Sequence, residues 1–356
     1  MNNTFDPTRA VIDGRDSWLF PDGKVLPVIS GGAFDDQITR DDTGALMPEE
    51  VAKEILGTIA EESVVMNLGR RLPNMSRKQR RQPVWQTLPQ AFFVSGDTGL
   101  KQSTMAAWDN VYLNAEEIAC YVVIPDAVAD DADYDILSEV KPGIISAIGK
   151  TFDQAVLYGI NAPASWPDPI TIGADEAGHN VTVGDVGDLY DDLLGEGGVL
   201  SLIEEDGYMP NGHVAALRMR AKLRGLREKD VDGNATGQPI FVGGRMEDGK
   251  TTYTLDGERL LFPRNGAVDP ARTLLVSGDW TQLVWAVRQD LTYKVITEGV
   301  ITDSENNIIM NLPQQDSSAL RVVFRVAWAL PNPINLVNED AGTRYPFATY
   351  EPVGAS

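Results

Sequence analysis

Two long segments of alternating residues near the C-terminal end most constrain the fold. The first spans residues 283–296 and the second residues 319–328, and a polar stretch at 297–307 separates them. Alternation of apolar and polar residues is typical of strands whose two faces meet different surroundings. The pattern therefore predicts a long, twisted hairpin arm with charges along one face. Such an arm suits contact with a neighbouring subunit better than catalysis.

The length and composition predict a globular chain with more than one core. The chain has 356 residues, 43% of them hydrophobic, and no run approaches the ~18 apolar residues that a membrane span needs. The first residues lack a basic segment followed by an apolar one, so we expect neither secretion nor a membrane partner. The single cysteine, Cys120, fits a reducing compartment and lies in an apolar run, which predicts a buried small hydrophobic residue.

The net charge of −22 argues against a surface that binds duplex DNA tightly. Such a surface normally carries a basic stripe, because neutralised phosphates supply most of the affinity. An acidic protein could still form a shell around DNA, since a lining that bound DNA tightly would impede packaging. The alternative is that the acidity only maintains solubility.

One dense basic cluster interrupts this acidic background. It consists of Arg70, Arg71, Arg77, Lys78, Arg80 and Arg81. We expect the cluster to contact an acidic neighbouring subunit, with a solvated loop or a nucleic-acid contact as the alternatives. The strand-like pieces and polar turns that follow, up to Leu113, predict a long two-stranded loop that projects from the body.

The rest of the chain mixes helices and strands, which predicts an α+β fold. An apolar stripe indicates a helix over 48–66, and a longer stripe indicates a helix that ends at Gly159 and that Pro142 kinks or starts. Between residues 160 and 280 we expect a compact module. Its predicted helices span 185–194, 199–205 and 212–227, and its predicted strands span 239–242, 251–255, 259–262 and 273–276.

One motif has the spelling of a phosphate-binding loop. It runs from Gly244 to Thr251 and places Lys250 where such a loop has its lysine. A phosphate site would need a helix directly afterwards, but the following residues are β-branched and soon reach a turn. Glu247 and Asp248 would also put negative charge where the phosphates must lie. We therefore interpret the motif as a hairpin turn, and the sequence predicts no cofactor.

The remaining polar residues predict no catalytic or metal site. His179 lies in a polar loop and His213 near a predicted helix start, so we interpret both as surface or capping residues. A cluster of acids precedes the long helix without the spacing of a calcium loop, so it is expected to cap that helix. Its members are Asp126, Asp130, Asp131, Asp133 and Asp135.

The order of these parts resembles the major capsid proteins of tailed double-stranded DNA bacteriophages, with the Hong Kong 97-type fold. The resemblance covers roughly residues 44–340 and rests on the ordered set of segments. Residues 118–132 resemble the strand and acidic turn before the family's spine helix, and 153–159 its end. Residues 209–217 resemble a helix start in the axial domain, and 278–280 the approach to the long strands.

The resemblance implies a division of the chain into parts. These are an N-terminal arm (1–68), an extended loop (69–113), a peripheral domain with the spine helix (114–160), an axial domain (161–280), the peripheral long strands (281–325), and an axial return with the C-terminal tail (326–356).

The resemblance also implies a structural rather than an enzymatic role. The chain is expected to self-assemble into hexamers and pentamers of an icosahedral shell in the virion, formed in the host cytoplasm around double-stranded DNA without sequence-specific binding. Expected partners are further copies of itself, a portal, a possible cement or decoration protein, and a separate scaffolding protein, because only about 44 residues precede the matching region. The alternatives are an encapsulin-like compartment and a phosphate-loop nucleotide enzyme.

Some members of that family cross-link a loop lysine to an asparagine of a neighbour, with a glutamate assisting. Lys101 stands where the lysine should be, but the other two positions fall near Asp316 and Val323. The resemblance therefore implies a shell without autocatalytic cross-linking. We expect inter-subunit contacts at the basic cluster, at the loop near Lys101, and at the 304–307 tip of the arm with Glu305 and Asn306.

Overall fold

The computed structural model describes the chain in ten stretches and divides it into two units, Met1–Val51 and Ala52–Ser356. The described residues are 8–12, 15–19, 25–27, 62–94, 101, 103–126, 136–228, 237–245, 251–302 and 307–354. In these stretches no helix is long and apolar enough to cross a membrane.

The first unit contains one small antiparallel sheet. Its strands are β1 (Thr8–Ile12), β2 (Arg15–Leu19) and β3 (Val25–Pro27), in the order β1-β2-β3. Most of the helix predicted over 48–66 lies outside the described residues. Its end appears in the second unit as α2 (Val64–Leu68), whose Val64, Val65 and Met66 are buried.

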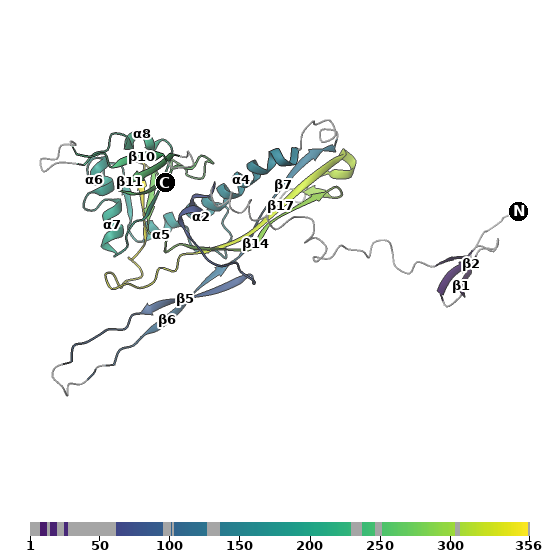
Figure 1. Cartoon of the computed structure of the whole chain (residues 1–356), viewed down its shortest axis with the longest axis horizontal. Coiled ribbons are helices and arrows are strands. Elements are labelled where there is room, and N and C mark those ends of the chain that lie inside the picture. The colour runs from purple at the N-terminus through teal and green to yellow at the C-terminus, as the bar shows by residue number, and fades with distance from the viewer. Residues whose placement is uncertain are drawn as a thin grey trace. The chain divides into compact units, whose positions relative to one another are not determined.

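The predicted hairpin arm is confirmed. Strands β14 (Val284–Ile296) and β17 (Ser317–Ala329) pair antiparallel, and β7 (Glu116–Pro125) and β4 (Arg70–Arg71) complete a sheet in the order β4-β14-β17-β7 (Figure 1). The turn between the long strands carries β15 (Val300–Thr302), β16 (Ile308–Asn311) and the short 3-10 helix η2 (Leu312–Gln315).

The predicted long helix is also confirmed, as α4 (Ile136–Tyr158). It runs through Pro142, so the proline does not start it, and it ends at Gly159, whose φ of 69° favours glycine. Three aromatic rings join the helix to the sheet. Phe152 meets Trp166 edge to face at 5.9 Å, and Trp166 meets Trp328 at 6.4 Å. All three rings are buried, so they form part of the core beneath the long strands.

A second sheet has seven strands and carries short helices. Its order is β10 (Phe241–Arg245), β11 (Thr251–Leu255), β12 (Glu258–Leu261), β9 (Gly212–Ala215), β13 (Leu275–Gly278), β18 (Phe347–Glu351) and β8 (Asn180–Thr182). The helices are α5 (Ile170–Glu176), α6 (Leu189–Leu194), α7 (Val199–Glu205) and α8 (Met219–Leu223). Leu193, Ile203, Leu275 and Tyr350 belong to the apolar cluster that holds helices and sheet together.

The helix predicted over 212–227 is wrong in its first half. Residues 212–215 form β9, a fully buried strand between β12 and β13, and only the short α8 follows. A buried strand is apolar on both faces, so its run of residues cannot be told from a helix by periodicity alone. The helix start that the resemblance implied at 209–217 is therefore wrong as well.

Both histidines are buried, contrary to the prediction. His213 lies on β9 with Nδ1 2.9 Å from Ser277 Oγ, and burial lowers its pKa to about 4. His179 Nε2 lies 3.2 Å from Asp206 Oδ2, and its Nδ1 lies 3.2 Å from the Phe347 carbonyl oxygen. Each ring therefore joins two segments that are distant in the sequence. Cys120, predicted as buried, is only half-buried on β7.

The interpretation of the phosphate-loop spelling as a hairpin turn fits its flanking strands. Strands β10 and β11 pair antiparallel, with Gly244 opposite Thr252 and Arg245 opposite Thr251. Residues 246–250, including Lys250, lie outside the described residues. Because Thr251 begins a strand instead of a helix, the amides that a phosphate loop takes from a helix N-terminus are not supplied there.

A buried carboxylate fixes α2 to the long helix. Asp153 on α4 accepts hydrogen bonds from Ser63 Oγ at 2.6 Å, from the Val64 amide at 3.0 Å and from the Val65 amide at 3.2 Å. These donors favour the ionised carboxylate, but burial outweighs them and raises the pKa of Asp153 to about 7. Asp153 thereby ties the segment after residue 61 to the core.

This raised pKa predicts a pH dependence of stability. The folded chain holds a proton on Asp153 up to about pH 7, whereas an unfolded aspartate loses it near its usual value of 3.8. The contribution of Asp153 is therefore fully present below that value and is lost as the pH rises through about 7. Urea unfolding of the unassembled chain between pH 4 and 8 should show that the free energy of unfolding falls as the pH rises. The Asp153→Asn variant should lack the part of this fall that comes from Asp153. Equal pH slopes for both chains would contradict the assignment.

Candidate subunit-contact surfaces

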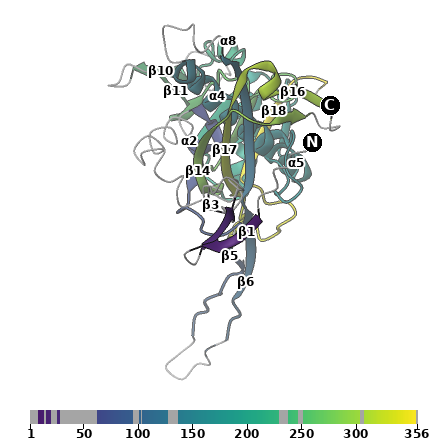
Figure 2. The same cartoon turned by 90° about the vertical axis from the view of Figure 1, so that its right-hand side faces the viewer.

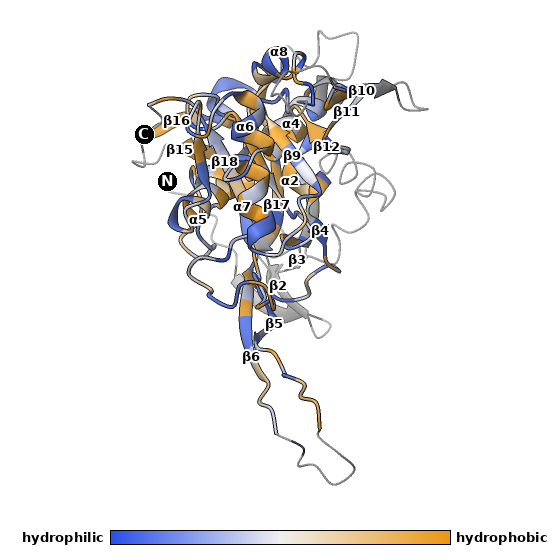
Figure 3. Cartoon of the chain, turned by 90° about the vertical axis from the view of Figure 1, so that its left-hand side faces the viewer, coloured by the Kyte–Doolittle hydropathy of each residue, from blue (hydrophilic) through white to orange (hydrophobic). Residues whose placement is uncertain are grey.

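The extended loop is a two-stranded hairpin that leaves the body of the second unit. Strands β5 (Gln79–Thr87) and β6 (Ala107–Asn114) pair antiparallel, as predicted (Figure 2). The rings of Trp85 and Trp108 lie against each other with centroids 3.6 Å apart and a tilt of 30°. Beyond the ladder, Phe93 is fully exposed and Met105 is 82% exposed. Figure 3 shows hydrophobic stretches, in orange, alternating with hydrophilic ones along the described part of this hairpin. A hairpin with no second layer cannot bury such side chains itself, so they are available to a neighbour.

The base of the hairpin, in contrast, is fixed to the body. Glu116 accepts a hydrogen bond from Ser165 Oγ at 2.7 Å and pairs with Lys78 Nζ at 3.3 Å. These two interactions, the serine bond first, lower the pKa of Glu116 against the opposing effect of its burial. The Trp166 indole also donates to the Asn114 carbonyl at 3.0 Å. The hairpin is therefore held in direction at its base while its distal part projects.

The structure divides the predicted basic cluster into two groups. Arg70 and Arg71 form the edge strand β4, where the Arg70 amide donates to Leu283 and the Arg71 guanidinium lies 5.4 Å from the Trp285 ring centroid. Arg77, Lys78, Arg80 and Arg81 lie at the hairpin base, and Arg80 donates to the Pro73 carbonyl at 3.0 Å. Arg80 is half-buried and the other five are exposed, so most of the cluster's charge remains accessible.

The other predicted contact residues fall in separate places. Lys101 is described and exposed, whereas Glu305 and Asn306 lie outside the described residues. Beside that tip, Ile308 and Ile309 on β16 are 69% and 61% exposed, which adds an apolar contribution that the prediction did not include.

The exposed face of the long sheet carries a basic patch that sequence reasoning missed. Arg321 on β17 lies directly opposite Lys294 on β14, and Arg325 follows on the same face. One acid compensates the two arginines, because Glu117 on β7 accepts two hydrogen bonds from Arg325, at 2.7 and 2.9 Å, and lies 3.8 Å from Arg321. Like charges directly opposite each other in a sheet are unfavourable. Only the strand register reveals this patch.

The described surfaces are suited to contact more than to chemistry. Within the described stretches, no three or more histidine, cysteine, aspartate or glutamate side chains are grouped so that they could hold a metal ion. The projecting apolar hairpin, the divided basic cluster and the basic sheet face lie on strands or on the segments that adjoin them. These are surfaces on which another folded chain could pack.

Known proteins resemble this chain in sequence and in fold. The profile of a family described as the Phage capsid family matches residues 43–336. The major capsid protein of Staphylococcus phage 80alpha is 24% identical over 286 residues, which are 80% of this chain and 81% of that protein. A solved chain from Microbacterium phage Oxtober96 is 30% identical with a TM-score of 0.67, covering 88% of this chain and 99% of that one. One from Mycobacterium phage Cain is 29% identical with a TM-score of 0.67, covering 90% and 99%.

The compensation on the sheet face predicts a salt-dependent loss of stability. Glu117→Gln leaves Arg321 and Arg325 without their acid beside Lys294, and we expect it to lower the free energy of unfolding of the unassembled chain by about 0.5–1 kcal/mol at low salt. The loss should shrink at high salt, because salt screens exposed charges. Urea unfolding at two salt concentrations measures it. Glu258→Gln is the control, since Glu258 is exposed on β12 without a described ion pair; equal effects of both substitutions would contradict the prediction.

Proposed function

We propose, from the premise that this chain belongs to the Phage capsid family, that it assembles into the hexamers and pentamers of an icosahedral phage head. Its relatives indicate that the chain is a structural major capsid protein of the virion. The observation that most supports the finer proposal is the projecting hairpin, fixed at its base by Glu116 and Ser165 and apolar beyond its ladder. It provides each subunit with a directed extension that a neighbour can cover.

The proposed assembly buries many modest surfaces instead of one large one. The apolar hairpin residues Phe92, Phe93 and Met105 supply hydrophobic area, and the accessible cations Arg70, Arg71 and Arg81 supply charge to a protein with a net charge of −22. Apolar area favours association, while complementary charge selects the partner and the register. Lys101 and the tip with Glu305 and Asn306 are proposed as further contacts.

The proposed contents of the shell are double-stranded DNA, held without sequence-specific binding. A strongly acidic subunit would repel phosphates over most of its surface and leave the DNA free to move during packaging. The proposed partners are a separate scaffolding protein, a portal and a possible cement or decoration protein. Assembly is proposed to take place in the host cytoplasm.

The proposed shell is not stabilised by autocatalytic cross-linking. Lys101 has a suitable nucleophile, but Asp316 and Val323 stand at the positions where the family's partner residues are expected, and the Val323 side chain is buried in β17. On the exposed face near Val323, Glu117 is already engaged by Arg325. A base that must deprotonate a lysine needs free carboxylate oxygens, so this acid is unsuited to the reaction.

The hairpin contact predicts loss of assembly without loss of folding. The double substitution Phe92→Asp and Phe93→Asp should abolish particles in sedimentation and electron microscopy, because it places charge in a surface that the assembly would bury. Its thermal unfolding as a monomer should match the parent, since both side chains are exposed. Val242→Asp, on the exposed part of β10, is the control and should assemble. Normal particles from the double variant would overturn the hairpin's role.

The absence of cross-linking predicts a simple gel result. Purified particles boiled in denaturant should give a single band at the 38.8 kDa of one chain, before and after prolonged incubation. Lys101→Arg particles should give the same pattern as the parent. A ladder of multiples that disappears with Lys101→Arg would show that the lysine forms isopeptide bonds.

A further inference from the structure

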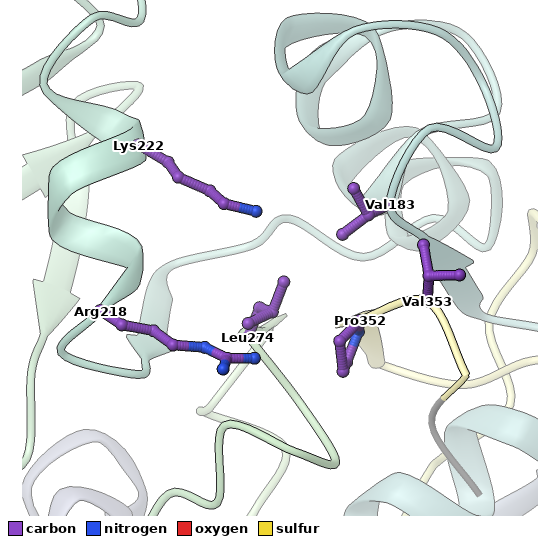
Figure 4. A pocket seen from close by; sticks show the side chains of 6 residues that line it. All are labelled: Val183, Arg218, Lys222, Leu274, Pro352 and Val353. Atoms are coloured by element: carbon purple, nitrogen blue, oxygen red, sulfur yellow. The ribbon is translucent and has the colours of Figure 1, made fainter.

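A hollow lies between α8 and the end of the seven-stranded sheet. It measures about 460 Å³ and is lined by Val183, Arg218, Lys222, Leu274, Pro352 and Val353. In Figure 4 the Arg218 and Lys222 side chains extend from α8 toward Val183, Pro352 and Val353, with Leu274 between the two sides. The hollow therefore combines two cations on one wall with an apolar floor and opposite wall.

The two cations are not neutralised within the described part of the chain. Arg218 donates to the Pro270 carbonyl, which fixes its direction, and no described carboxylate lies within 4.0 Å of Arg218 or Lys222. The hollow therefore offers two cations beside apolar walls in a chain with a net charge of −22. A complementary ligand would bring carboxylates next to apolar side chains.

The same chain carries a loop with that chemistry. Leu336 and Val337 are 74% and 67% exposed, and Glu339 and Asp340 follow them, also exposed. Single exposed apolar residues are common, but here two large ones adjoin two acids in five residues. We call residues 336–340 the acidic loop.

The acidic loop is held in place by hydrogen bonds, so it would lose little conformational entropy on binding. Asn335 Oδ1 accepts from the amides of Val337 at 3.0 Å and Asn338 at 2.8 Å. The Asn335 and Asn338 side-chain amides both donate to Asp206 at the end of α7, each at 2.7 Å. A Cβ on Gly207 would come within 2.7 Å of Val337, so the loop lies directly against this glycine.

The hollow and the acidic loop lie at opposite ends of one strand pair. Strands β13 and β18 are antiparallel, with Leu275 opposite Tyr350 at one end and Gly278 opposite Phe347 at the other. The hollow uses residues beyond the first end, Leu274 and Pro352, whereas the acidic loop leads through Tyr345 into the second. Two complementary surfaces at different places on one subunit allow copies to meet head to tail, and such contacts form a ring when the rotation from one copy to the next closes.

We propose that the acidic loop of one copy occupies the α8 hollow of the next copy around a capsomer. Glu339 and Asp340 would pair with Arg218 and Lys222, while Leu336 and Val337 would cover the apolar floor. This inference rests on the proposed assembly and names the surfaces that form its rings. The strand ladder of the hairpin runs beside the chain that leads into the acidic loop, because the Ile334 amide donates to the Trp85 carbonyl near the far end of that ladder at 3.3 Å. Both would therefore reach the same neighbour.

The hollow fits this loop better than a DNA phosphate. A duplex presents a continuous row of phosphates and calls for a stripe of cations. The hollow presents two cations one helical turn apart, and its other four lining residues are apolar. Phosphates would leave those apolar walls uncovered.

Disulfide trapping in assembled particles tests the contact directly. With Cys120→Ala in both chains, one chain carries Val337→Cys and the other Lys222→Cys, and the two are assembled together and oxidised. We expect a covalent dimer in particles and none in the unassembled mixture. Thr302→Cys in place of Val337→Cys, at an exposed position on β15 in the turn between the long strands, is the control and should give no dimer.

A charge exchange tests the pairing. Arg218→Glu with Lys222→Glu should lower the particle yield on the order of tenfold, as should Glu339→Lys with Asp340→Lys. The four substitutions together should restore the yield, and Arg224→Glu on the exposed end of α8 should leave it unchanged.

Particles that form normally from both charge-reversed variants, together with no disulfide in the trapping experiment, would overturn the inference and leave the capsid proposal standing. A parent chain that never forms particles would overturn the proposed assembly itself. Loss of co-purifying DNA with unchanged particle yield would show that the hollow binds phosphates instead.

Discussion

The packing of α4 against the buried face of the long sheet is the interaction on which the other features depend. Phe152 on the helix reaches Trp328 on β17 through Trp166, and none of these rings is exposed by more than 9%. Removal of a ring this large from a core typically costs about 3–5 kcal/mol. Because one face of the sheet is used by the helix, the register of β14, β17 and β7 is fixed, and the charged residues are forced onto the other face.

That fixed register positions the projecting parts. Trp166, which belongs to the core, also donates to Asn114 at the hairpin base, and its neighbour Ser165 binds Glu116. The direction of the hairpin is therefore set by the same residues that join helix and sheet. Asp153, one residue after Phe152, fixes α2 and with it the start of β4. A rigid body with directed extensions is what repeated assembly requires, since ordering flexible extensions would cost conformational entropy at every contact.

The acidic composition acquires its meaning from where the cations gather, because 52 acidic residues outnumber 30 basic ones. Lys294, Arg321 and Arg325 lie on one sheet face, Arg218 and Lys222 beside one hollow, and the basic cluster at β4 and the hairpin base. In a protein with a net charge of −22, like copies repel each other except where such patches meet acids. Repulsion elsewhere would disfavour wrong contacts, and the local cations would select the right ones.

The sequence by itself determined the parts with strong, regular patterns. The two long alternating segments, the helix ending at Gly159 and the two-stranded loop were all predicted from periodicity and turn residues, and the order of the parts pointed to the capsid family. Only the tertiary structure decided what depends on neighbours distant along the chain. Residues 212–215 became a central strand because β12 and β13 enclose them, and His179 became buried because Asp206 and Phe347 close around it. The basic sheet face and the α8 hollow likewise arise from cross-strand register and from packing between elements, which periodicity along a single segment does not encode.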